Sequence, residues 1–182
     1  MIEKVFCGDS EMQTTHRLTK SVEISRKVLM ALVLAAIYAA LVIGLQPISF
    51  IQIQIRIADI LSPVTYVTGF EGVVGLTIGT LIANTVSPYG VFDMAIGTLC
   101  TFAYSILNWF LGKVFGYRKV LLLVVAVLDA AVVGLFIGVL LLGIIFNAGN
   151  LLHLFMLLTL ENLVATSIGA FLVVPRVRKY LR

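Results

Sequence analysis

The side chains best suited to hold a polar ligand lie in one short stretch, IQIQIRIADILSP, at residues 51–63. Two amides, one guanidinium and one carboxylate occur close together there, on Gln52, Gln54, Arg56 and Asp59. A guanidinium donates hydrogen bonds in a fixed fork, a carboxylate accepts at two oxygens, and an amide does both. This set can therefore bind a polar molecule through directed hydrogen bonds.

The same stretch alternates isoleucine, at positions 51, 53, 55 and 57, with other residues. A period of two predicts an extended segment instead of a helix. Extended backbone at the rim of a membrane bundle is tolerated where protein or water satisfies it, so we expect a lid over a ligand site. Two alternatives stay open: an interfacial strand that only plugs the bundle, and a helical pair between Arg56 and Asp59, which are three residues apart.

Three further polar residues interrupt apolar segments: Asn84, Asp93 and Glu161. An ionisable side chain at membrane depth costs at least about 2.5 to 3.5 kcal/mol on insertion scales, so each one is a candidate for a site. Counted from the expected span ends, Asn84 and Asp93 lie within about two turns of the outer surface, as do Arg56 and Asp59, whereas Glu161 lies near the midplane. We expect a pocket that opens outward and has Glu161 as its floor.

Each of these residues also has a structural interpretation. Asp93 could cap the start of its helix, where the helix dipole favours a negative charge, and Asn84 could only hydrogen-bond a neighbouring helix. Asp129 lies at mid-depth with no assigned partner, and the sequence does not decide between a site and a helix-to-helix bond. Glu161 is the hardest to explain structurally, because a carboxylate there needs a donor or a proton.

The elements that carry these residues are membrane helices. The mean hydropathy is +1.10 and only 12% of the residues are charged, which is too little polar surface for a soluble domain. Because about 20 helical residues cross the hydrocarbon core, we expect an all-α membrane protein. The predicted fold is a bundle of six transmembrane helices with a short extended outer loop between the first two, at residues 28–45, 57–68, 70–86, 91–111, 120–146 and 151–174.

Positive charge predicts the orientation, since short loops rich in Lys and Arg stay on the cytoplasmic side. The leader holds five such residues, the loop after the fourth span three, and the tail four, which together make 12 of the 13. We therefore expect a polar cytoplasmic segment at 1–27, a transmembrane domain at 28–174 and a basic cytoplasmic tail at 175–182. The net charge of +4 then reflects orientation in the cell membrane and gives no reason to expect a nucleic-acid partner.

Motifs for catalysis are absent from the sequence. It has no Gly-rich phosphate loop with Lys and Ser or Thr, no HExxH, no GxSxG and no Cys and His cluster for a metal. The two cysteines, Cys7 and Cys100, lie in a polar leader and an apolar segment and are not expected to meet. We expect no enzyme, no cofactor and no metal, and interpret the chain as a substrate-capturing subunit that takes energy from a partner.

The first span carries small residues at intervals of four, Ala31, Ala35 and Ala39, with Ala36 and Ala40 in a second row. This spacing lets another helix approach closely. That helix lies either inside the bundle or in another subunit.

Three segments in this order resemble the QueT family of queuosine-precursor transporters: IQIRIADIL (53–61), GLTIGTLIAN (75–84) and DMAIGTLCT (93–101). Gln54, Arg56 and Asp59 match the family's Gln, Arg and acidic residue, and Asn84 and Asp93 match its asparagine and aspartate. Asp59 stands where the family more often has Glu.

The resemblance implies a substrate-binding S component of an energy-coupling factor (ECF) transporter. Such a subunit captures a 7-deazaguanine-type base from outside, and a transmembrane coupling subunit with two cytoplasmic ATPases drives uptake. The face formed by Ala31, Ala35 and Ala39 would dock on the coupling subunit.

The implied ligand suits the polar residues chemically. A guanine-like edge offers N–H donors to Glu161 or Asp59 and a carbonyl that accepts from Arg56 or Asn84. The alternatives are an S component for another vitamin or nucleobase, and a non-transporting membrane scaffold whose buried polar groups only hold helices together.

Overall fold

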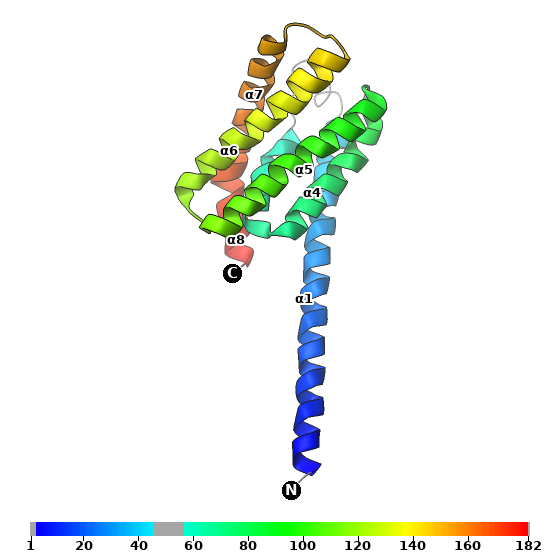
Figure 1. Cartoon of the computed structure of the whole chain (residues 1–182), viewed down its shortest axis with the longest axis vertical. Helices are drawn as coiled ribbons and strands as arrows, with labels where there is room; N and C mark the ends of the chain where they lie inside the picture. The colour runs from blue at the N-terminus through cyan, green and yellow to red at the C-terminus, as the bar shows by residue number, and fades with distance from the viewer. Residues whose placement is uncertain (1–2, 46–56, 182) are drawn as a thin grey trace.

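The computed structural model describes the backbone of residues 3–45 and 57–181, and side chains from residue 19 onward within these ranges. The described residues form six helical segments and no strand (Figure 1). Several segments combine an α-helical stretch with a 3₁₀-helical or π-helical stretch. In chain order they are α1 (Glu3–Gly44), η1 (Ile57–Val64) with α3 (Thr65–Thr68), α4 (Phe70–Ala83) with η2 (Asn84–Val86), α5 (Gly90–Phe115), α6 (Lys119–Val133) with η3 (Gly134–Ile145), and α7 (Leu151–Ile168) with η4 (Gly169–Val173) and α8 (Val174–Leu181).

The helices α4 to α8 and the C-terminal half of α1 form one bundle (Figure 1). Its two ends are called here the hairpin end, where the turn at residues 146–150 joins η3 to α7, and the α8 end, where the C-terminus lies. The N-terminal half of α1 projects beyond the α8 end (Figure 1).

Four segments are long and apolar enough to cross a membrane: Thr19–Gly44, Gly90–Phe115, Lys119–Ile145 and Leu151–Leu181. The other two, Ile57–Thr68 and Phe70–Val86, are shorter apolar helices. All six predicted spans are therefore helical, but two of them fall short of the length that crosses a bilayer alone. The predicted extended outer loop falls in residues 46–56, outside the described residues.

The first helix starts much earlier than predicted, at Glu3 instead of residue 28. The leader is polar but contains no proline, and its Glu, Lys, Arg and Gln residues are good helix formers. A helix can therefore continue out of the apolar segment without a break. The last helix likewise continues through the basic tail to Leu181, with Pro175 at the second position of α8.

The segment η1 is a 3₁₀ helix with Pro63 inside it. Proline lacks an N–H donor, which disfavours a regular α-helix at this point. Five of its eight residues are buried, so the segment lies inside the bundle. Gly169 permits this position, since a Cβ there would collide with the carbonyl oxygen of Ile60.

The alanine row of α1 packs against the glycines of α4. A Cβ on Gly75 would lie 2.6 Å from the carbonyl oxygen of Ala31, and one on Gly79 would lie 2.8 Å from that of Ala35. Ala35 and Ala39 are buried. The close approach predicted from the spacing is thus made inside the bundle, while Ala36 and Ala40 of the second row are exposed.

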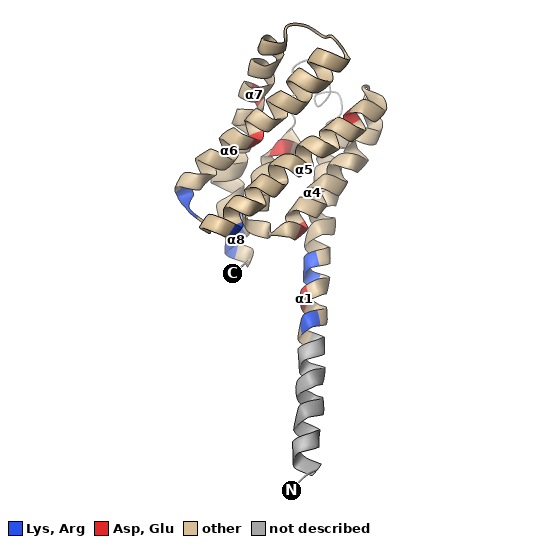
Figure 2. Cartoon of the chain, viewed as in Figure 1, with Lys and Arg blue, Asp and Glu red and all other residues tan. Residues whose placement is uncertain are grey.

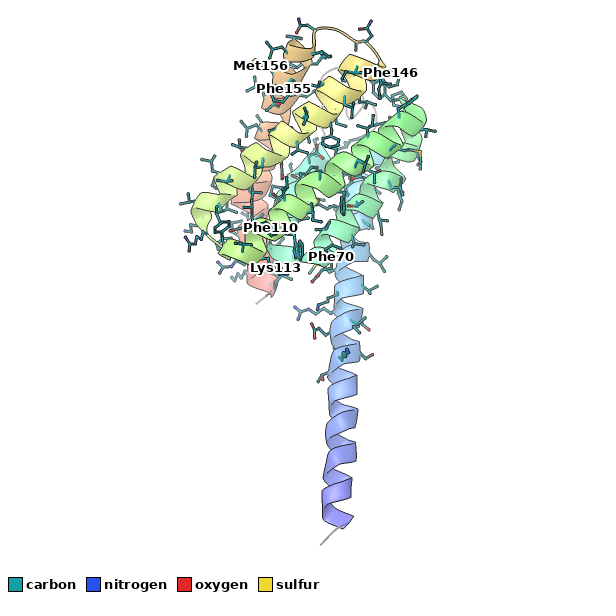
Figure 3. The ribbon with its side chains drawn as sticks, viewed as in Figure 1. Phe70, Phe110, Lys113, Phe146, Phe155 and Met156 are labelled. Carbon is teal, nitrogen blue, oxygen red and sulfur yellow. The ribbon has the colours of Figure 1, made fainter. Side chains whose placement is uncertain are left out.

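Charge is distributed unevenly along the bundle. The Lys and Arg side chains among the described residues gather at the α8 end and on the projecting part of α1, whereas Asp and Glu also occur within the bundle (Figure 2). At the α8 end, Lys113 lies 5.0 Å from the ring centre of Trp109, which also contacts Phe70 edge-on (Figure 3). This distribution gives the two ends different electrostatic character.

Candidate substrate site and the buried polar network

Asp59 joins three helices through hydrogen bonds. The hydroxyl of Tyr38 on α1 donates to its Oδ1 at 2.9 Å, and Nδ2 of Asn162 on α7 donates to its Oδ2 at 2.6 Å. Asp59 itself lies on η1 and is 3% exposed. Because each carboxylate oxygen has a donor, the polar group is stabilised inside an apolar bundle.

Asp59 lies deeper than the sequence predicts. Asn162 is eleven residues beyond the start of α7 at Leu151, which corresponds to about 17 Å of helix from the hairpin end. Its hydrogen bond places Asp59 at that same depth. Asp59 therefore lies at the level of Asn162 and not within two helical turns of the hairpin end.

A second cluster surrounds Asp129. Ser62 Oγ donates to its Oδ2 at 2.7 Å, and Nδ2 of Asn108 donates to its Oδ1 at 2.8 Å. The 3₁₀ geometry of η1 aligns this cluster with the first, because residues three apart in such a helix lie above one another. Asp59, Ser62 and Thr65 form this row, and all three are buried.

A third cluster lies at the hairpin end. Nδ2 of Asn84 donates to the carbonyl oxygen of Asp93 at 2.9 Å, and Ser87 Oγ donates to Asp93 Oδ2 at 2.6 Å. Gly97 makes room for it, since a Cβ at that position would collide with Nδ2 of Asn84. These contacts tie η2 to the first turn of α5. The structure thus brings Asn84 and Asp93 together, as the sequence predicts.

Three buried amides each use their nitrogen and leave their oxygen without a partner among the described residues. They are Asn84, Asn108 and Asn162. Their nitrogens all donate to acceptors, so the amide orientations are fixed by the hydrogen bonds. The interior is therefore rich in acceptors, both carboxylate and amide oxygens.

Glu161 faces a groove between η1 and α7. The groove has a volume of about 410 Å³. Its walls are apolar apart from Glu161, and Oε2 of this residue is buried with no hydrogen-bond partner among the described residues. The lining residues are Ile57, Ile60, Leu160, Glu161, Val164, Ala165 and Ile168.

The groove and the Asp59 cluster share the same two helices. Successive residues of a helix point about 100° apart, so Glu161 turns to the groove while Asn162 turns to Asp59. On η1, Ile57 and Ile60 line the groove while Asp59 between them faces the bundle. A ligand in the groove would lie against the wall that carries Asp59 on its other side.

Comparison with known families places most of the chain in one family. A family model described as QueT transporter matches residues 28–176. The chain belongs to the QueT transporter family. No curated protein and no solved structure matches the chain.

Membership of the QueT transporter family confirms the resemblance read from three short segments and extends it to nearly the whole described bundle. It indicates a multi-pass membrane transporter with a small-molecule substrate. It also argues against an enzyme, although it names no substrate and no partner subunit.

The structure does not bring all predicted site residues of this QueT transporter together. Asp59 and Glu161 share one helix pair, whereas Asn84 and Asp93 form a separate cluster. Gln54 and Arg56 lie outside the described residues. Tyr89, near the start of α5, packs edge-on against Phe146 at 5.1 Å between ring centres.

The sequence analysis missed four residues of the polar network: Tyr38, Ser62, Asn108 and Asn162. A signal was present, because each is a polar residue within an otherwise apolar segment. The predicted candidates are ionisable residues, Asn84 and the two glutamines of the stretch 51–63. Uncharged polar side chains within a membrane segment also need hydrogen-bond partners, so they too indicate contacts between helices.

Proposed function

We propose that this QueT transporter is the substrate-binding S component of an ECF-type transporter. It captures a queuosine precursor, a 7-deazaguanine-type base, from outside the cell. Partner subunits then drive uptake: a transmembrane coupling subunit and two cytoplasmic ATPases.

The observation that carries the proposal is the excess of acceptors around η1 and α7. Glu161 Oε2 and Asn162 Oδ1 are both buried without a donor among the described residues. A buried acceptor without a donor costs about 1–3 kcal/mol, so a bound group that supplies N–H donors is favoured. The 2-amino-pyrimidinone edge of a deazaguanine supplies adjacent N–H donors that a carboxylate can accept in pairs.

The groove supplies the apolar part of such a site. Ligand sites combine mainly apolar walls with a few polar groups, and sites of about 300–1,000 Å³ are usual. The groove of about 410 Å³ has this character, with Glu161 as its polar residue. In the proposal, Gln54 and Arg56, which precede Ile57 in the chain, complete the polar contacts.

Asn84 and Asp93 have a supporting role in this proposal. Their cluster holds η2 against α5 at the hairpin end. Substrate contact by the free Oδ1 of Asn84 is part of the proposal, since this atom lacks a donor among the described residues.

Orientation follows from charge. The α8 end carries the described Lys and Arg residues (Figure 2), so we assign it to the cytoplasm and the hairpin end to the outside. Both termini are then cytoplasmic.

Docking of the coupling subunit on α1 is also part of the proposal. Ala31 and Ala35 already meet the glycines of α4, and Ala39 is buried, whereas Ala31 stays half-buried. The exposed Ala36 and Ala40 continue the small-residue surface toward the lipid. A helix of the partner can approach closely along this edge.

Thermal unfolding of the purified protein with a panel of ligands tests the proposal. The panel contains deazaguanine precursors, guanine and common vitamins. A deazaguanine should raise the midpoint in the wild type, because a ligand that binds only the folded state stabilises it. The rise should be lost in Arg56→Ala and retained in Met156→Ala, an exposed position on α7 away from the groove.

The two alternatives give different results in the same experiment. Stabilisation by another vitamin or nucleobase would support an S component with a substrate other than a deazaguanine. If the protein is folded and no member of the panel stabilises it, the result would favour a non-transporting membrane scaffold.

A further inference from the structure

We propose that a pocket at the α8 end binds the headgroup of a zwitterionic phospholipid, with phosphatidylethanolamine as the lipid to test. The pocket has a volume of about 300 Å³ and lies between α1, the turn that joins α3 to α4, and the end of α8. It shares no lining residue with the groove that contains Glu161. The inference does not depend on the substrate proposed above.

One face of α1 forms the first wall of the pocket. This wall consists of Glu23, Arg26, Lys27 and Met30, and their spacing of three and four residues places them on one side of the helix. Charges of both signs occur on α1 where it leaves the bundle (Figure 2). Lys27 Nζ lies 2.6 Å from Glu23 Oε1, so these two charges compensate each other. Arg26 has no ion pair or side-chain hydrogen bond among the described residues.

The turn between α3 and α4 forms the opposite wall. Gly69 in this turn has a φ of +86°, and the amide of Gly72 donates to its carbonyl oxygen at 3.1 Å. The carboxylate of Glu71 lies against the same turn, because a Cβ on Gly69 would be 2.9 Å from Glu71 Oε2. Glu71 lines the pocket together with Val67 and Thr68. It makes no ion pair or side-chain hydrogen bond within the described part of the chain.

The charges that line the pocket match those of a zwitterion. Because Lys27 and Glu23 pair with each other, the charges left in the pocket are the positive Arg26 and the negative Glu71. A phosphoethanolamine headgroup carries one phosphate and one primary ammonium group, separated by two carbons. The guanidinium of Arg26 can donate two hydrogen bonds to the phosphate, and the carboxylate of Glu71 can accept from the ammonium group. The two walls therefore supply one partner for each end of the headgroup.

The apolar surface beside the pocket favours a lipid over a soluble phosphate compound. Phe70, next to Glu71 in the chain, begins α4 and lies at the α8 end (Figure 3). Phe70, Val74 and Ile78 are exposed and recur at intervals of four, so they form a row along α4. An acyl chain can lie along this row while its headgroup occupies the pocket. A soluble phosphate compound would not gain this apolar contact.

The pocket lies on the opposite side of α1 from the exposed alanines. Lys27 lines the pocket, whereas Ala36 is exposed. These residues are nine positions apart, which corresponds to about two and a half helical turns, so their side chains point in opposite directions. A lipid in the pocket therefore leaves Ala36 free for the docking proposed above.

Native mass spectrometry of the delipidated full chain in detergent tests the lipid site. Phosphatidylethanolamine, phosphatidylcholine and phosphatidylglycerol with identical acyl chains are titrated separately. Phosphatidylcholine keeps the phosphate but has no N–H donor, and phosphatidylglycerol has no positive charge. We expect one phosphatidylethanolamine molecule to bind, with an affinity about tenfold higher than that of either other lipid.

Two variants separate the two headgroup contacts. Glu71→Gln replaces the carboxylate with a neutral amide, so the affinity for phosphatidylethanolamine should fall about tenfold, to that for phosphatidylcholine. Arg26→Gln removes the phosphate donor, which both lipids use, so it should weaken both by a similar factor. Lys20→Gln is the matched control, because Lys20 is an exposed basic residue of α1 outside the pocket. This variant should bind both lipids as the wild type does, and thermal unfolding without lipid checks that each variant is folded.

Three results would overturn the lipid site. The first is equal affinity of the wild type for phosphatidylethanolamine and phosphatidylcholine, since the ammonium group would then not be recognised. The second is phosphatidylglycerol binding at least as tightly, which would indicate a basic surface for anionic lipids. The third is a wild type that retains no lipid. If Arg26→Gln and Glu71→Gln then also reduce co-purification of the coupling subunit, the pocket belongs to that subunit. Failure of the deazaguanine panel would reject the proposed substrate and leave the lipid site standing.

Discussion

The side-chain amide of Asn162 donates a hydrogen bond of 2.6 Å to Asp59, a residue 103 positions earlier in the chain. This contact ties the 3₁₀ segment η1 to α7. Glu161, next in the chain to Asn162, and Ile60, next to Asp59, line the groove on the other side of the same two helices. The polar contact therefore supports the wall of the candidate substrate site.

Replacing Asn162 with leucine should destabilise the protein. The substitution removes the donor to Asp59 Oδ2 inside the bundle, and the loss of a hydrogen bond to a buried charged group costs about 1–3 kcal/mol. Equilibrium unfolding in detergent would measure the loss.

Met156→Ala is the comparison for this variant. Met156 lies on α7 (Figure 3) and is 57% exposed, so its truncation should change stability by less than about 0.5 kcal/mol. Equal stabilities of Asn162→Leu and the wild type would show that the contact to Asp59 carries no energy.

A methyl group on Gly79 should weaken the packing of α1 on α4. Its Cβ would lie 2.8 Å from the carbonyl oxygen of Ala35, so the two helices must separate. We expect Gly79→Ala to lose about 1–3 kcal/mol of unfolding free energy.

Gly44→Ala tests the same change without the clash, since nothing lies within 4 Å of a Cβ there. Alanine is the better helix former, so this variant should be neutral or slightly more stable. A loss of the same size at both positions would mean that the cost does not come from helix packing.

The assigned orientation predicts which end of the bundle is accessible from outside. In a background without Cys7 and Cys100, Ala148→Cys in the hairpin should react with a membrane-impermeant maleimide added to intact cells. Val120→Cys, at an exposed position near the α8 end, should react only after the cells are permeabilised. The reverse pattern would place the basic end outside and contradict the positive-inside assignment.

The sequence predicts the helical segments well because local signals mark their ends. The segments 57–68 and 70–86 agree with the structure residue for residue, separated by Gly69, whose φ of +86° favours glycine. The start of α1 differs from the prediction, because a run of apolar residues indicates which part of a helix lies in the membrane. It does not indicate where the helix itself begins.

The candidate site was less predictable, because it depends on contacts between distant segments. Asn84 and Asp93 are nine residues apart, and their proximity follows from a short turn. The contact between Asp59 and Asn162 depends on how η1 and α7 are placed in the bundle, which no local pattern encodes. The sequence singled out Glu161 over Asn162 because it is charged, yet the amide is the one that faces the buried network.

The most direct test of the account is a calorimetric titration of the purified protein with a 7-deazaguanine queuosine precursor, repeated on Glu161→Gln. We predict saturable binding at one site in the wild type and affinity at least about tenfold weaker in the folded variant, equivalent to about 1.4 kcal/mol. A folded, monodisperse wild type that binds no deazaguanine, or a Glu161→Gln variant that binds it equally well, would contradict the proposed substrate site.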